Sequence, residues 1–183
     1  MRIVGGERRG YQLKAPRGRK TRPTSDMVRE ALFSILSPVV QGSVFYDVFA
    51  GSGAVGIEAL SRGAERVVFV EESPASCRII NMNLKNTGYL KRSLVLQKDV
   101  FALGSLRELP RADIVFMDPP YDSDLAARIL LALPGIDALG DAGVVVVEHS
   151  RRIPSPDIAG PFVLRRRKYY GDTALAIYYR QEE

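Results

Sequence analysis

The tetrapeptide Asp118-Pro119-Pro120-Tyr121 brings together groups that can act on the exocyclic amine of a flat base. Two consecutive prolines fix the backbone, and because neither can donate to a strand ladder, their carbonyls remain available as acceptors. A rigid carbonyl and the Asp118 carboxylate can accept the N–H groups of the amine, which exposes its lone pair to a methyl donor. Tyr121 can stack on the base, a contact worth about 1–3 kcal/mol in nucleic-acid proteins. The tetrapeptide therefore predicts a catalytic loop for amine methylation.

A glycine-rich segment lies upstream of this loop and is typical of nucleotide-cofactor sites. Gly51, Gly53 and Gly56 form the pattern G-x-G-x-x-G, and Glu71 lies twenty positions after Gly51. Glycines there permit a sharp turn and the close approach of a ligand, while the acid can accept hydrogen bonds from ribose hydroxyls. By itself the pattern fits a nicotinamide-dependent dehydrogenase, or a turn whose glycines only pack a helix against a strand.

Asp47, four residues before the first glycine, favours a different cofactor. A carboxylate inside the pocket would repel a pyrophosphate and attract a cationic group. S-adenosylmethionine carries an ammonium and a sulfonium, so an acid at each of two strand ends suits this cofactor better than NAD. Asp99 is placed to accept a hydrogen bond from the adenine amine, and the Val100 backbone amide is placed to donate one to a ring nitrogen. The alternative interpretation of Asp99 is a plain helix cap. The predicted S-adenosylmethionine site consists of Asp47, Gly51, Ser52, Gly53, Glu71, Asp99 and Val100.

Positive charge is concentrated near the start of the chain. Residues 1–22 contain eight arginines and lysines against one acid, a net charge of +7, whereas the whole chain carries +5. A second basic run, Arg165–Lys168, lies near the other end. Such asymmetry predicts a polyanionic partner, with a solvated basic tail as the alternative. The candidate phosphate-binding residues are Arg8, Arg9, Arg17, Arg19, Lys20, Arg22 and Arg167.

The elements that must position these residues alternate between strands and helices from residue 43 onward. Apolar runs predict strands at 44–49, 67–70, 94–97, 114–117 and 144–147. With helical segments between them, this order predicts an α/β fold with a mostly parallel sheet and helices on both faces. The last segments, 162–168 and 174–179, bracket a Tyr-Gly-Asp turn and predict an antiparallel hairpin. Ahead of the sheet, residues 2–15 predict a short hairpin, and Ser25 predicts a helix start.

Composition excludes several other classes of protein. The apolar fraction is 46% and the charged fraction 26%, as in ordinary globular proteins. A single cysteine, Cys77, and a single histidine, His149, exclude a disulfide framework and a multi-histidine metal centre. Neither residue is assigned a catalytic role, because Cys77 fits a helix core and His149 fits a strand end. We expect a cytoplasmic monomer without a metal ion or a membrane span.

Seven strings of the sequence carry a resemblance to a known family. They are Met1–Gly6, Thr21–Thr24, Val28–Glu30, Phe49–Ala54, Glu58–Ala64, Asp118–Tyr121 and Tyr170–Thr173. With these strings the chain resembles, over nearly its whole length, the bacterial 16S ribosomal RNA guanine-N2 methyltransferase family. The N-terminal strings and the Gly-Asp-Thr turn are the most specific to that family, whereas the glycine and Asp-Pro-Pro-Tyr motifs are shared by amine methyltransferases in general.

The resemblance implies a Rossmann-like class I methyltransferase with a seven-stranded sheet and a small N-terminal β-hairpin extension. Residues 1–23 would form a basic RNA-binding extension, and residues 24–183 the S-adenosylmethionine-dependent domain. The implied reaction methylates the exocyclic N2 of one guanine in 16S ribosomal RNA of the assembled or assembling small subunit. Two alternatives stay open. One is a DNA adenine-N6 methyltransferase, although no separate target-recognition domain fits in the chain. The other is a non-catalytic RNA-binding assembly factor on a methylase scaffold.

Overall fold

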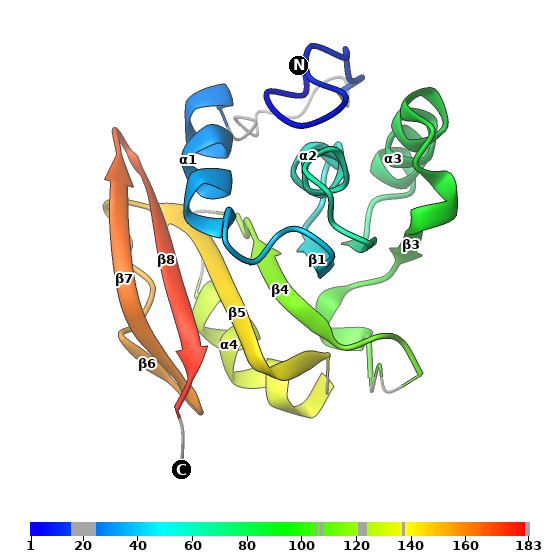
Figure 1. Cartoon of the computed structure of the whole chain (residues 1–183). Coiled ribbons are helices and arrows are strands. Elements are labelled where there is room, and N and C mark those ends of the chain that lie inside the picture. Colours follow the sequence, from blue (N-terminus) through cyan, green and yellow to red (C-terminus); the bar gives the residue numbers. More distant parts are fainter. Residues whose placement is uncertain (16–24, 105, 107, 121–123, 137, 182–183) are drawn as a thin grey trace.

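The computed structural model describes residues 1–15, 25–104, 106, 108–120, 124–136 and 138–181. Its strands are β1 (Val44–Val48), β2 (Arg66–Glu71), β3 (Ser93–Gln97), β4 (Ala112–Met117), β5 (Leu139–Ser150), β6 (Ile158–Ala159), β7 (Phe162–Tyr170) and β8 (Thr173–Arg180). Its helices are α1 (Asp26–Leu36), α2 (Ala54–Ser61), α3 (Pro74–Thr87) and α4 (Leu125–Ile136), with short turns η1 (Leu90–Arg92) and η2 (Val100–Ala102). The strands form one sheet in the order β3-β2-β1-β4-β5-β8-β7-β6 (Figure 1).

The strands β1 to β5 pair in parallel and carry the apolar runs predicted from the sequence. Such strands are rich in valine, isoleucine and phenylalanine because both faces of a parallel sheet are covered. The helices α1, α2 and α3 pack on one face, and α4 packs on the other (Figure 1). The structure therefore confirms the α/β fold with helices on both faces.

The C-terminal part of the sheet reverses the strand direction. β8 pairs antiparallel with both β5 and β7, so it lies inside the sheet and not at its edge. Gly171 lies in the turn between β7 and β8 at φ 61°, a left-handed conformation that suits glycine. The predicted hairpin is confirmed. The sheet has eight strands where seven were expected, because the two-residue β6 pairs with the outer side of β7.

Residues 1–15, which we call the N-terminal segment, form a closed loop in place of a regular hairpin. Their antiparallel pairing is a single bridge between Arg2 and Gln12. Ser61 of α2 accepts hydrogen bonds from the backbone N–H groups of Glu7 and Arg8 in the turn of this loop. These contacts hold the turn against the helix, so the turn residues do not pair as a hairpin. Ile3 and Leu13 are 1% and 6% exposed and belong to the main core. The boundary expected at residue 23 lies outside the described residues.

Local signals set the ends of two helices that matter for the site. The Ser25 hydroxyl accepts from Val28 N at 3.2 Å and caps α1, as the sequence predicts. Ser73 caps α3 in the same way, and Gly88 ends this helix at φ 82°. Within the described part of the chain, no helix has the length and apolar character needed to cross a membrane.

Candidate active site

The acidic residues of the predicted site come together at one edge of the sheet. Asp47 lies in β1, Glu71 ends β2, Asp99 follows β3 and Asp118 follows β4. These four strands are neighbours in the order β3-β2-β1-β4 and run parallel. Their carboxyl ends therefore meet at the same edge, which is where open α/β sheets bind their ligands.

The glycine loop between β1 and α2 is held in an unusual backbone conformation. Gly51 and Gly53 have φ values of 56° and 75°, and Phe49 has φ 62° without being a glycine. A Cβ at Gly53 would lie 3.2 Å from Ile80, and a Cβ at Gly56 would collide with the Phe69 ring. The glycines thus permit the turn and the close packing of α2 on β2. Sequence analysis missed the strain at Phe49, which is a feature of ligand-binding loops.

Glu71 connects the end of β2 to this loop. Its carboxylate accepts from Gly51 N at 2.8 Å and from Ser73 N at 2.9 Å, and the side chain is 5% exposed. Both carboxylate oxygens are engaged by the backbone, Oε2 by Gly51 and Oε1 by Ser73. The carboxylate is therefore fixed in direction beside the loop.

Asp47 is the most deeply buried acid of the edge. It is 2% exposed, and its Oδ2 accepts from Gly56 N at 2.9 Å. Burial raises the pKa of this carboxyl to about 8; the Gly56 N–H acts in the opposite direction, and the charge of Glu71 raises the pKa further. A cationic group bound nearby would favour the ionised form. The electrostatics of the edge therefore suit a positively charged ligand.

Asp99 and Val100 lie at the start of η2, after β3. The Asp99 carboxylate accepts from Phe101 N at 3.0 Å and caps the turn, which was the alternative interpretation of this residue. Val100 is buried, whereas Asp99 is exposed. The cap leaves the second carboxylate oxygen for other contacts. The adenine-binding role of both residues stays a prediction.

A cavity of about 480 Å³ opens beside the predicted catalytic loop. Pro119, Pro120, Glu148, His149 and Ser155 are among the residues that line it. Tyr121, the fourth residue of the motif, lies outside the described residues. Sequence analysis gave no role to Glu148, His149 and Ser155, because they lie in and after β5 and no local pattern links them to the Asp-Pro-Pro loop.

His149 lines this cavity with an uncharged side chain. Its Nδ1 lies 2.8 Å from the Ser150 carbonyl, and the side chain is 4% exposed. Burial lowers the pKa of the imidazole most strongly, the Ser150 carbonyl opposes this shift, and the charge of Arg167 adds to it. The ring is therefore neutral at pH 7 and presents a polar edge without a charge.

The predicted phosphate-binding residues fall into three groups. Arg8 and Arg9 are exposed on the N-terminal segment. Arg167 is turned inward, because its Nη2 donates to the Ser155 carbonyl at 2.6 Å and pairs with Asp157 at 3.2 Å. Its neighbours Arg165 and Arg166 are exposed. The remaining predicted residues, which lie outside the described part of the chain, are Arg17, Arg19, Lys20 and Arg22.

The sheet, the glycine loop and the Asp-Pro-Pro loop at a common edge define a class I methyltransferase. The chain belongs to the ribosomal RNA small subunit methyltransferase D family, and the family model described as Conserved hypothetical protein 95 matches its residues 1–179. Ribosomal RNA small subunit methyltransferase D of Escherichia coli (strain K12) is 34% identical over 185 residues, covering 100% of this chain and 91% of that protein.

Other known proteins show the same similarity. The Bacillus subtilis protein YlbH, assigned as an rRNA methyltransferase, is 36% identical over 182 residues, covering 97% of this chain and 98% of its own. A solved Escherichia coli structure, assigned as a methyltransferase, has a TM-score of 0.87 at 33% identity and covers 100% of this chain and 99% of its own. These matches confirm the family indicated by the sequence strings.

Proposed function

We propose that this protein transfers a methyl group from S-adenosylmethionine to the exocyclic N2 of a guanine in 16S ribosomal RNA. The observation that supports the proposal is the shared sheet edge, where the buried Asp47 lies on the strand next to β4, and Asp118 directly follows β4. The names of the relatives support small-subunit ribosomal RNA as the substrate. We further propose that the enzyme acts as a cytoplasmic monomer.

S-adenosylmethionine would supply the electrophilic methyl group on its sulfonium. We assign its ammonium to Asp47, whose burial makes ionisation depend on a nearby cation. We assign its ribose to Glu71, which is already oriented by the Gly51 and Ser73 amides. Gly51 and Gly53 have no Cβ, so the backbone of the glycine loop would let the methionine part of the cofactor lie close to the strand ends.

The target base is assigned to the cavity beside Pro119 and Pro120. The Asp118 carboxylate and the carbonyl of the adjacent proline would accept the N–H groups of the amine and direct its lone pair toward the methyl group. Neutral His149, which also lines the cavity, would contact the base without attracting the phosphates. A guanine must leave its stack to reach this depth, which costs a few kcal/mol.

Contacts with the RNA backbone can offset this cost. Residues 1–23 are proposed as the RNA-binding extension, and residues 24–183 as the methyltransferase domain. Arg8 and Arg9 are exposed on the part of the extension that the structure describes, and Arg165 and Arg166 are exposed on β7. Phosphate contacts of this kind give a binding affinity that falls with salt concentration.

The test is nucleoside analysis by mass spectrometry of small-subunit RNA from a strain without this gene. Restoring the gene should restore N2-methylguanosine in 16S RNA, and restoring an Asp118→Ala variant should not. Methylated adenine in DNA would support the adenine-N6 alternative. Normal RNA methylation in the deletion strain, together with no binding of S-adenosylmethionine to the purified protein, would support a non-catalytic assembly factor.

A further inference from the structure

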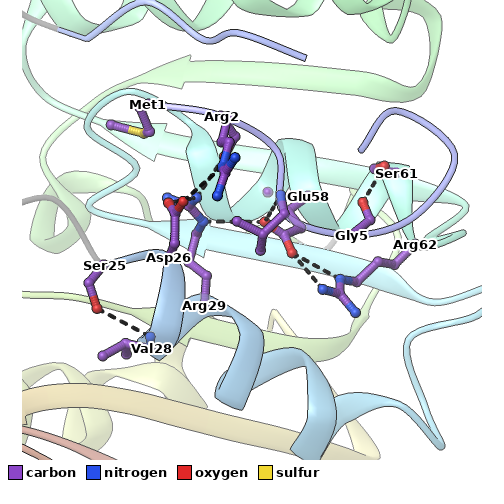
Figure 2. A network of polar contacts seen from close by, with 12 residues as sticks. Met1, Arg2, Gly5, Ser25, Asp26, Val28, Arg29, Glu58, Ser61 and Arg62 are labelled. Atoms are coloured by element: carbon purple, nitrogen blue, oxygen red, sulfur yellow. Dashed lines mark hydrogen bonds and ion pairs between the residues drawn. The ribbon is translucent and has the colours of Figure 1, made fainter. Parts of the chain in front are cut away.

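Besides the Ser61 contacts at its turn, the N-terminal segment is held to the methyltransferase core at both of its ends. At its beginning, the buried Glu58 of α2 accepts from Val4 N at 3.2 Å and from Arg29 Nε at 3.2 Å. Arg29 in turn donates through Nη2 to the Arg2 carbonyl at 2.6 Å. Figure 2 shows this network of ion pairs between α1, α2 and the first residues of the chain. It fixes the start of the segment to the two helices.

At its end, the segment is held by Asn83 of α3, a side chain that is 0% exposed. Asn83 Oδ1 accepts from Lys14 N at 2.9 Å, and its Nδ2 donates to the Lys14 carbonyl at 2.9 Å. The same Nδ2 donates to the Ser52 carbonyl at 3.0 Å. Only one orientation of the amide satisfies these three contacts, because a flipped side chain would place a donor against Lys14 N.

Asn83 therefore touches two regions that the sequence separates widely. Ser52 lies between Gly51 and Gly53 in the glycine loop, and its hydroxyl is also 3.5 Å from Met1 Sδ. Lys14 lies three positions before Arg17, the first of the four candidate phosphate-binding residues that follow it in the N-terminal extension, Arg17, Arg19, Lys20 and Arg22. The buried amide of Asn83 thus contacts both the proposed cofactor loop, at Ser52, and the proposed RNA-binding extension, at Lys14.

We propose that Asn83 is a positioning residue that couples the binding of S-adenosylmethionine to the binding of RNA. This inference rests on the proposed function. A cofactor bound against the glycine loop would hold the Ser52 carbonyl and with it the amide that bonds to Lys14. RNA bound to the basic residues of the N-terminal extension would hold Lys14 and, through the same amide, the loop. Each ligand then strengthens the binding of the other by the same factor, as linkage requires.

The test uses the full-length protein, S-adenosylhomocysteine as the cofactor probe and a 16S RNA fragment. RNA affinity is measured by fluorescence anisotropy with and without saturating S-adenosylhomocysteine. We expect wild-type protein to bind RNA at least about fivefold more tightly with the probe present, a factor at the lower end of measured couplings. Asn83→Ala should still bind both ligands, with a coupling factor close to one. At saturating cofactor, its KM for RNA should be higher than that of the wild-type protein, whereas kcat should change little and the two KM values should converge at limiting cofactor.

Asn81→Ala is the matched control, because Asn81 is exposed on the same helix and donates only to the Cys77 carbonyl. It should keep the wild-type coupling factor. Equal RNA affinity of the wild-type protein with and without the probe would overturn the inference even if the Asn83 variant failed to fold. Full coupling in a folded Asn83→Ala would also overturn it. Failure of the wild-type protein to bind S-adenosylhomocysteine at all would instead contradict the proposed function.

Discussion

Two buried carboxylates on neighbouring elements have opposite surroundings. Glu58 of α2 is 0% exposed and makes ion pairs with Arg29 at 3.2 Å and Arg62 at 2.8 Å. Asp47 of β1 is 2% exposed, and the contacts that set its pKa are a backbone N–H and the like charge of Glu71. Glu58 lies under the N-terminal segment, whereas Asp47 lies at the ligand edge of the sheet.

The comparison indicates that the Glu58 carboxylate stabilises the fold, whereas the Asp47 carboxylate is suited to binding a ligand. A buried charge is costly unless it is paired, so the protein supplies two guanidinium groups to Glu58. Among the residues that the structure describes, no cationic side chain forms an ion pair with Asp47, and burial raises the pKa of its carboxyl to about 8. Strongly shifted acids in a cleft mark functional sites for this reason. Substitution of Glu58 should therefore affect the free energy of unfolding, whereas substitutions at the ligand edge of the sheet should affect ligand binding and the rate of methyl transfer.

The largest effect on stability should follow removal of the Glu58 carboxylate. Glu58→Ala removes the buried carboxylate that pairs with Arg29 and Arg62, while Arg29 keeps its contact with the more exposed Asp26 at 2.8 Å. The loss of this buried pairing should lower the free energy of unfolding by about 3–5 kcal/mol. Chemical denaturation measures this loss. Asp141→Ala is the control, because Asp141 also lies near two arginines, at 3.9 Å and 3.8 Å, but is 89% exposed. Its loss should stay below about 1 kcal/mol. Equal losses would mean that burial does not set the strength of these pairs.

On the ligand side, Asp118→Ala should reduce the rate of methyl transfer about 100- to 1000-fold, the usual effect of losing one group that stabilises the transition state. Single-turnover kinetics with saturating cofactor and RNA measures the chemical step. Stability and cofactor affinity should stay near those of the wild-type protein. A rate within about threefold of wild type would contradict the role of Asp118, since it corresponds to less than 1 kcal/mol of barrier.

Glu71→Ala should weaken S-adenosylmethionine binding by about 1–3 kcal/mol, because it removes both the proposed ribose acceptor and the contact that orients Gly51. Isothermal titration calorimetry measures the change. Glu72, the exposed next residue, provides the control. Glu72→Ala should bind the cofactor like the wild-type protein, and a similar weakening in both variants would point to general electrostatics.

The smallest effect concerns pH and Asp47. In the free protein the carboxyl is protonated below about pH 8. The cofactor ammonium favours the ionised form, so binding releases a proton and the affinity should rise by up to about tenfold per pH unit below that value. Above it the ammonium itself loses its proton, and the affinity should fall. Asp47→Asn should remove the rising limb, and a rise retained in this variant would assign the pH dependence to another group.

The site residues that follow strands were predictable from the sequence because their signals are local. The glycine loop follows β1 and Glu71 ends β2. These strands are parallel, with Val48 opposite Val70, so the loop and the acid lie side by side at the carboxyl edge. The same reasoning placed Asp118 at this edge. Helix ends at Ser25 and Gly88 were predictable for the same reason, since a cap acts on the residues next to it.

The polar contacts of the N-terminal segment were not predictable. Asn83 is one of several polar residues on α3, and its role depends on Lys14, which lies 69 positions away. The Glu58 contact with Val4 spans 54 positions. Residues 2–15 pair less regularly than the predicted hairpin, because their turn bonds to Ser61 of α2. No local sequence pattern reveals this partner. The two-residue β6 carries too few residues to show a strand pattern.

The position of β8 between β5 and β7 has a consequence for synthesis of the protein. The sheet cannot be completed until the chain up to Arg180 has been made, since β8 supplies the pairing partner of both neighbours. Until then β5, with its run of four valines, presents an unpaired edge of the kind that promotes aggregation. The parallel half can form earlier, as translation adds elements in order. Nascent chains halted before Thr173 should therefore bind chaperones, and those extended past Arg180 should not.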